Sequence, residues 1–200
     1  MKSRGFTLIE LVVVLSIFSL IAVVVSLLYV SGLTQEREES LRSQLVLKGE
    51  TAVDIFTRDV QSAWQVAASY TSGGTTYTSG GSTLVLGLPA VDASGNLISS
   101  GGSFTTDYVV YRTAVPYTYR SVFPAAGSSR QARTDQALIN KQYADGSTPF
   151  SYQDATTGGL QNSSASQATY VTWFVPMQQQ FKGRLVKYNA GGFARLRNKA

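Results

Sequence analysis

The chain has 200 residues, a formal net charge of +5, and neither cysteine nor histidine. This composition excludes disulfide bonds, thiolate metal sites and every catalytic arrangement that needs an imidazole or a thiol. Behind a long apolar N-terminus there is room for one globular domain of about 130 residues with a single core.

An apolar segment follows the first few residues of the chain. Phe6–Val30 would span about 38 Å as a helix, which exceeds the hydrocarbon thickness of about 30 Å. Lys2 and Arg4 precede it, so the positive-inside rule predicts a cytoplasmic N-terminus, with the residues after Gly32 on the other side of the membrane. Ser26–Gly32 is unlike the small-residue cleavage site of an ordinary signal peptide, so we expect the segment to be retained.

One carboxylate, that of Glu10, lies near the start of this segment. A charged side chain inside a bilayer costs roughly 2.5–3.5 kcal/mol, so a cationic partner is expected. The alternative is that Glu10 lies close enough to the interface for its carboxylate to reach water.

The run Gly5-Phe6-Thr7-Leu8-Ile9-Glu10, between a short basic leader and an unbroken apolar helix, resembles the class III signal of type IV pilins and type II secretion pseudopilins. The resemblance implies that prepilin peptidase cuts between Gly5 and Phe6 and methylates the new amino terminus of Phe6. It also implies that Glu10 meets the terminal ammonium of a neighbouring subunit. Such subunits are assembled into a filament with other pilins or pseudopilins at an inner-membrane assembly platform.

The expected organisation has four segments. They are a leader (1–5), a transmembrane and filament-core helix (6–33), an amphipathic continuation of that helix (34–69) and an extracytoplasmic β-rich domain (70–200). Apolar residues three, four or eight positions apart predict the amphipathic part: Leu41, Leu45, Val53, Phe56, Val60, Trp64 and Ala67. Gly49 lies within it at a cost of about 1 kcal/mol relative to Ala, so we expect that the helix can bend there.

The remainder of the chain has the composition of a β domain. Residues 70–82 predict a turn-rich linker, and β-branched and aromatic runs predict strands at 84–88, 107–112, 117–123, 168–175 and 181–188. Asp92–Asn96 predicts a hairpin turn. The fold class is therefore α+β, with a long helix packed on an antiparallel sheet, and the resemblance implies the lollipop shape of a pilin.

Looser patterns resemble W-type minor pilins and J-type pseudopilins. They are Phe56-Thr-Arg-Asp59, Tyr108-Val-Val-Tyr111 and Tyr119-Arg120. The apolar helix also lacks the proline that major pilins usually have near its far end, which weighs against a bulk filament subunit.

No residue pattern marks a catalytic or metal site. A Ser-Lys dyad is compatible with the composition, but no particular serine stands out, and the aspartates from Asp92 onward occur singly in turn contexts. Asp92–Asn96 has only part of a calcium loop. We therefore expect no enzymatic activity, no cofactor and no metal.

The C-terminal tail is basic, because no acidic residue follows Asp154. Cations alternate with aromatic residues in it, as in surfaces that track a nucleic-acid backbone. The candidate contact residues are Lys182, Arg184, Lys187, Arg195 and Arg197. One interpretation is that these residues contact DNA. The alternative is a terminal strand whose basic side chains are solvated or face an acidic partner subunit.

The sequence thus predicts a noncatalytic minor pilin or pseudopilin subunit, anchored in the inner membrane and processed by prepilin peptidase. Its filament would serve pilus biogenesis, secretion, motility or DNA uptake. Two alternatives stay open: a DNA-binding or adhesive tip subunit, and a membrane-tethered enzyme that only resembles a pilin.

Overall fold

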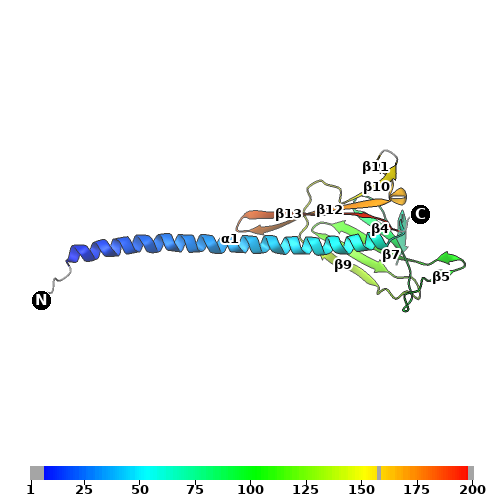
Figure 1. Cartoon of the computed structure of the whole chain (residues 1–200), viewed down its shortest axis with the longest axis horizontal. Coiled ribbons are helices and arrows are strands. Elements are labelled where there is room, and N and C mark those ends of the chain that lie inside the picture. The colour runs from blue at the N-terminus through cyan, green and yellow to red at the C-terminus, as the bar shows by residue number, and fades with distance from the viewer. Residues whose placement is uncertain (1–6, 157–158, 198–200) are drawn as a thin grey trace. The chain divides into compact units, whose positions relative to one another are not determined.

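The computed structural model describes residues 7–156 and 159–197. The chain divides into two compact units, Met1–Arg42 and Ser43–Ala200. Helix α1 (Leu8–Ser62) contributes to both units (Figure 1). The predicted α+β class is confirmed, because this long helix packs on antiparallel sheets.

The first unit consists, among the described residues, of the N-terminal part of α1. Its large apolar side chains from Leu8 to Leu33 each expose between 38% and 82% of their surface. The helix is long and apolar enough to cross a membrane. A helix that is apolar on all sides needs lipid or other helices around it, so this unit is not self-sufficient in water.

The second unit begins with the amphipathic part of α1. The residues that it buries recur at spacings of three and four, as a one-sided stripe requires: Leu45, Gly49, Ala52, Phe56, Asp59 and Val60. The predicted end of the helix at Ser69 is wrong, because α1 ends at Ser62. The apolar spacing continues through Trp64 and Ala67, but their amides donate to strand carbonyls, at 3.0 Å to Gly87 and 2.9 Å to Val85.

Two antiparallel sheets complete the second unit. The first has the strand order β1-β4-β7-β8-β9, with β1 (Gln65–Val66), β4 (Thr83–Pro89), β7 (Thr106–Ala114), β8 (Tyr117–Phe123) and β9 (Arg133–Ile139). The second has the order β11-β10-β12-β13, with β10 (Phe150–Thr156), β11 (Gly159–Asn162), β12 (Tyr170–Phe181) and β13 (Arg184–Arg195). Two small hairpins, β2 (Ser69–Ser72) with β3 (Thr75–Thr78) and β5 (Ser99–Ser100) with β6 (Ser103–Phe104), and the 3-10 helix η1 (Ala165–Gln167) complete the described elements.

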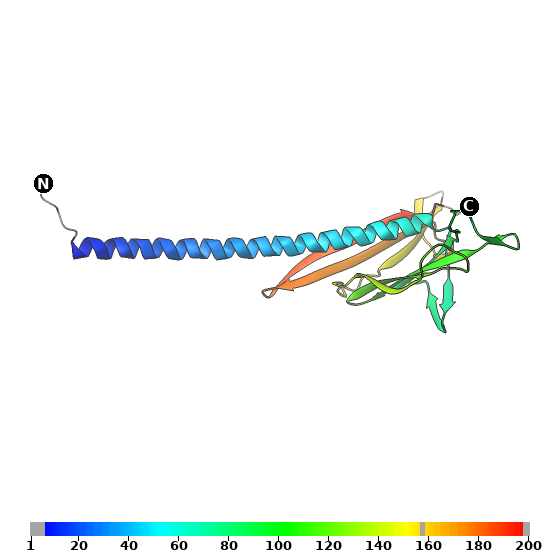
Figure 2. The same cartoon turned by 90° about the horizontal axis from the view of Figure 1, so that it is seen from below.

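The core lies where both sheets meet the last turns of α1. Figure 1 shows β12 and β13 along one side of this part of the helix and β7 and β9 along the other, and Figure 2 shows both sheets beneath it. The ring of Phe56 lies 5.6 Å from that of Tyr111 on β7 and 5.0 Å from that of Trp173 on β12, between ring centroids. One helix side chain therefore joins the two sheets.

The predicted strands 84–88, 107–112 and 117–123 lie within β4, β7 and β8. The predicted strand 181–188 is wrong, because the chain reverses at Lys182 and Gly183, whose φ angles are 46° and 79°. This two-residue turn joins β12, which starts at Tyr170 and runs on past 175, to β13. A Gly at the second turn position accommodates the left-handed backbone that such a hairpin requires.

Two further turn predictions have different outcomes. The predicted linker 70–82 is wrong, because it contains most of the β2–β3 hairpin, whose Tyr70 stacks on Tyr108 with centroids 4.2 Å apart. The turn at Asp92–Asn96 is confirmed: Asp92 Oδ1 accepts the amides of Ser94 at 2.8 Å and Asn96 at 2.9 Å. This side chain closes the loop upon itself, as aspartate does in Asx turns.

Gly49 lies where α1 crosses β13. A Cβ atom at Gly49 would lie 2.6 Å from Tyr188 Cε1 and 3.0 Å from Ala190 Cβ. Gly192 of β13 is equally close to the helix, because a Cβ there would lie 3.1 Å from Val53 Cγ1. The two glycines let helix and strand approach closely, which gives Gly49 a packing role that the sequence did not predict.

We expect Gly49→Ala to destabilise the second unit by about 1–3 kcal/mol, the usual cost of overpacking, which outweighs the helix propensity of Ala. The matched control is Gly32→Ala in the same helix, where a Cβ meets nothing within 4 Å. Thermal unfolding of the full chain in detergent, followed by tryptophan fluorescence, measures both. A Gly49→Ala melting temperature at or above that of the control would contradict the packing role.

Candidate functional site

Glu10 lies in the first turn of α1 and closes a capping box with Thr7. Glu10 Oε2 accepts hydrogen bonds from the Thr7 amide at 3.0 Å and from Thr7 Oγ1 at 2.9 Å. The Glu10 amide donates in return to Thr7 Oγ1 at 3.4 Å. Thr7-Leu8-Ile9-Glu10 has the Thr-x-x-Glu spacing of such a box, so this role could have been predicted from the sequence.

The capping box leaves part of the Glu10 carboxylate available. Its second oxygen, Oε1, has no hydrogen-bond partner among the described residues. The predicted processing residues Gly5 and Phe6 lie outside the described residues. Glu10 can therefore cap its own helix and still accept a hydrogen bond from an incoming ammonium group.

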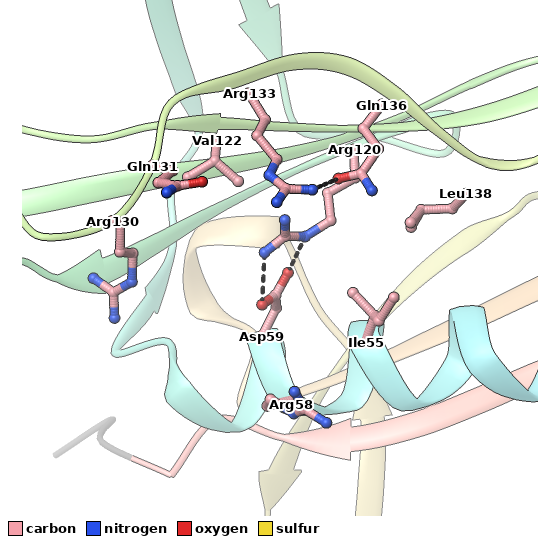
Figure 3. A pocket seen from close by; sticks show the side chains of 10 residues that line it. All are labelled: Ile55, Arg58, Asp59, Arg120, Val122, Arg130, Gln131, Arg133, Gln136 and Leu138. Atoms are coloured by element: carbon pink, nitrogen blue, oxygen red, sulfur yellow. Dashed lines mark hydrogen bonds and ion pairs between the residues drawn. The ribbon is translucent and has the colours of Figure 1, made fainter.

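A buried ion pair joins the end of α1 to the first sheet. Arg120 of β8 donates two hydrogen bonds to Asp59, from Nε to Oδ2 at 2.6 Å and from Nη2 to Oδ1 at 3.0 Å (Figure 3). The hydroxyl of Tyr111 on β7 donates to Asp59 Oδ2 at 2.6 Å. The side chains of Arg120 and Asp59 expose only 17% and 11% of their surface. A two-pronged guanidinium–carboxylate contact of this kind fixes orientation as well as distance.

The electrostatics of this cluster follow from burial and from the Asp59 charge. Burial raises the pKa of Tyr111 well above its usual value, and the adjacent Asp59 carboxylate raises it further. For Arg120, burial alone would lower the pKa, but its hydrogen bonds to Asp59 and the carboxylate charge outweigh burial and raise it. The phenol thus stays a proton donor to Asp59, and the guanidinium stays charged.

This cluster brings together three stretches that lie apart in the sequence. Asp59 ends Phe56-Thr-Arg-Asp59, Tyr111 ends Tyr108-Val-Val-Tyr111, and Arg120 ends Tyr119-Arg120. Their direct contact was not predicted, since the register that places Tyr111 opposite Arg120 is set by the pairing of β7 with β8.

A second carboxylate organises the loop between β8 and β9. Asp107 is fully buried and accepts the Ala125 amide and Ser128 Oγ, both at 2.7 Å. Arg130 Nη1 lies 2.5 Å from Asp107 Oδ2 and also donates to the Pro89 carbonyl at 2.6 Å. The loop is therefore anchored to β7 through an ion pair and to β4 through a hydrogen bond.

Between this loop, α1 and the strands β8 and β9 lies a hollow of about 430 Å³. Four arginines line it, Arg58, Arg120, Arg130 and Arg133, together with one acidic residue, Asp59. The sequence predicted no site here. The only sequence signal is the occurrence of Arg120, Arg130 and Arg133 close together in the chain, and the contribution of Arg58 from α1 requires the tertiary structure.

The predicted basic tail does not form one patch. Lys182 lies in the β12–β13 turn and Arg184 begins β13, whereas Arg195 ends β13 and Arg197 lies two residues beyond it. Eight residues, about 27 Å of strand, separate Lys187 from Arg195.

The cations of this tail also contact aromatic rings of the protein itself. Lys187 Nζ lies 5.1 Å from the centre of the Tyr143 ring, and the Arg195 guanidinium lies 5.8 Å from that of Tyr170. By strand alternation, Arg184 faces the opposite side from Lys187. Contact of these residues with DNA stays a prediction.

Among residues 7–156 and 159–197 there is no group of three acidic side chains close enough to hold a metal ion. Asp59 and Asp107 are instead engaged in ion pairs, and Asp92 closes a turn.

The comparison with protein families matches residues 1–26 to the prokaryotic N-terminal methylation motif. This is the class III signal of type IV pilins, so the resemblance seen in the sequence is confirmed for this segment. Comparisons with curated proteins and with solved structures gave no match.

We expect Asp59→Asn to lower the free energy of unfolding of the second unit by about 3–5 kcal/mol, because it leaves the buried Arg120 charge without a counterion. The triple variant Asp59→Leu/Tyr111→Phe/Arg120→Met should recover most of that loss, since it leaves neither a buried charge nor the buried Tyr111 hydroxyl without a partner. Urea unfolding of the full chain in detergent measures all variants.

The control for this prediction is Asp54→Asn, an exposed aspartate five residues earlier in the helix, which should change stability by less than about 0.5 kcal/mol. Equal losses for Asp54→Asn and Asp59→Asn would show that the ion pair does not hold the helix on the sheet.

Proposed function

We propose that the chain is a noncatalytic minor pilin or pseudopilin, a subunit of a type IV pilus-like filament. The methylation motif indicates a pilin-like precursor that prepilin peptidase processes. The cleavage site in this proposal lies between Gly5 and Phe6, and the methylated residue is Phe6. The long apolar helix fits a protein that is anchored in a membrane and then assembled with other pilins.

The observation that carries the proposal is the continuity of the motif with an uncovered apolar helix. Directly after Thr7, α1 has large apolar side chains on every side, and none of those from Leu8 to Leu33 is buried. In the precursor this surface is covered by lipid, with Lys2 and Arg4 on the cytoplasmic side. In the filament it is covered by the same helix of neighbouring subunits.

Glu10 is the assembly residue in this proposal. Cleavage before Phe6 would create an ammonium group four residues from Glu10, and the helices of neighbouring subunits bring ammonium and carboxylate together. An ion that is costly alone in hydrocarbon becomes favourable when a partner neutralises it. Glu10 Oε1, which has no hydrogen-bond partner among residues 7–156 and 159–197, supports this role.

The assignment to a minor subunit depends on the pattern of the second unit. The three stretches that resemble W-type minor pilins and J-type pseudopilins contribute the Asp59, Tyr111 and Arg120 side chains of one ion-pair cluster. Their contact supports reading them as one structural feature. The absence of proline from α1 agrees with this assignment.

Processing gives the first test of the proposal. In a host with prepilin peptidase, the mature chain is expected to begin at a methylated Phe6, and Gly5→Leu is expected to keep the leader. Intact-mass analysis of the membrane fraction decides it. A mature chain that begins near Gly32 would mean an ordinary secretory signal and would contradict the proposal.

Assembly gives the second test. Gln at position 10 preserves the capping box and lowers the cost of insertion, so Glu10→Gln should be inserted and processed normally. It loses only the charge-assisted contact, worth roughly 1.5–3 kcal/mol, and should be depleted at least tenfold from sheared filaments.

Glu10→Lys should assemble worse than Glu10→Gln, because two cations would then face each other. Quantitative mass spectrometry of sheared filaments from cells that co-express wild type and variant measures the ratio directly. Equal incorporation of Glu10→Gln and wild type would refute the role of the charge.

A further inference from the structure

The hollow between α1 and the β8–β9 loop carries more positive charge than the protein balances. Arg120 is paired with Asp59, and Arg130 is paired with Asp107. Arg58 has no ion pair among the described residues, and Arg133 donates only to the neutral Gln136 Oε1, at 3.2 Å. Two guanidinium groups thus border one hollow without a carboxylate of their own (Figure 3).

The walls of the hollow favour an acidic peptide over a bare phosphate. Aliphatic side chains of Ile55, Val122 and Leu138 line it beside the arginines. Its volume of about 430 Å³ accommodates several side chains. Arginine forks bind carboxylates in two-pronged geometry, as Arg120 already does here, and the aliphatic wall suits the methylene groups of glutamate.

The chain itself contains a segment of this chemistry. Residues 33–41, LTQEREESL, include three glutamates and one arginine. Glu36 and Glu39 are exposed and three residues apart in α1, so their carboxylates lie on one face of the helix. The second unit, in contrast, has 13 basic and 8 acidic residues, a net charge of +5, and no other described segment of the chain has three acids in four residues.

We propose that the hollow binds the acidic segment 33–41 of a second copy of this chain, with Arg58 and Arg133 contacting Glu36 and Glu39. Residues 39 and 55 belong to the same helix, and a helix does not fold back upon itself, so the contact requires two chains. It joins a surface of one copy to a different surface of the next, a head-to-tail contact that requires two copies of this minor subunit to be neighbours in the filament. The inference deepens the proposed function and rests on it for its role in assembly.

The test uses the full chain in detergent and a fluorescein-labelled peptide LTQEREESL with blocked ends. Fluorescence anisotropy should show binding that weakens as salt increases. Arg58→Gln/Arg133→Gln should weaken binding at least tenfold, and so should a peptide with Gln at both 36 and 39. The matched control Lys187→Gln/Arg197→Gln, which removes two cations outside the hollow, should bind within twofold of wild type.

Folding and the nature of the anion are controlled in the same experiment. Arg58 and Arg133 are exposed, so the melting temperature of the double variant should equal that of wild type. Binding that is equal in both double variants would overturn the proposal. A short duplex DNA that displaces the peptide and itself depends on Arg58 and Arg133 would assign the hollow to phosphates, and would overturn it too.

A second measurement asks whether the two surfaces meet in cells. The chain has no cysteine, so Gln136→Cys in one copy and Ser40→Cys in another place single thiols beside the hollow and the acidic segment without altering a charge. Mild oxidation should give a disulfide-linked dimer only when both copies are co-expressed, and not when Lys187→Cys replaces Gln136→Cys. Absence of the dimer overturns the proposal even if the peptide binds.

The masses of the same chains separate this inference from the proposed function. Processing at Phe6 without a dimer removes only the contact proposed here. Chains that keep the leader or begin near Gly32 contradict the proposed function itself.

Discussion

The uncovered apolar surface of the first half of α1 is the constraint on which the rest of the structure depends. At roughly 25 cal/mol per Å² of apolar surface, such a helix cannot remain in water. It has to be surrounded by lipid or by other helices, and both surroundings are apolar. A single charge at its start, Glu10, is therefore costly, and the capping box with Thr7 offsets part of that cost. In the proposed filament, the ammonium group of a neighbouring subunit would offset the rest.

The same helix meets a different environment beyond residue 42. There the buried residues of the helix form one stripe along its side, and the small residues Gly49 and Ala52 in this stripe let β13 approach. The last turns end at the Asp59–Arg120 ion pair and the ring of Phe56, which contact both sheets. A buried ion pair contributes little net stability, but it penalises every rotation of the helix that separates its partners. The pair thus holds one face of α1 against the sheets and leaves Arg58, one residue earlier, at the hollow.

Much of the architecture could be predicted because it depends on local patterns. The apolar run, the class III signal and the β-branched runs of β4, β7 and β8 each occupy a continuous stretch of sequence. The end of α1 could not be predicted, because Trp64 and Ala67 keep helical spacing and are drawn into pairing with β4 only in the folded chain. The turn at Lys182-Gly183 was missed because Pro176 and Gln178–Gln180 lack strand propensity, which placed the predicted break between the two strands there instead.

The candidate sites divide in the same way. Glu10 is recognisable from sequence, and even its capping partner Thr7 has a readable spacing. The arginine-lined hollow is not recognisable from sequence. Arg58 and Arg133 lie 75 residues apart in the chain, and only the packing of α1 beside β8 and β9 brings them to one hollow. The basic tail is one continuous stretch of sequence. In the structure, however, its cations lie on opposite faces of β13 and at its two ends.

The central claim is that the apolar half of α1 exchanges lipid for the helices of neighbouring subunits. A photo-crosslinking amino acid at Val14, inside this half, tests it most directly when membranes and sheared filaments of the same cells are irradiated. The account predicts lipid adducts in the membrane fraction and, in filaments, crosslinks to the N-terminal helix of another subunit. Lipid adducts alone in both fractions, or a mature chain that lacks position 14, would contradict it.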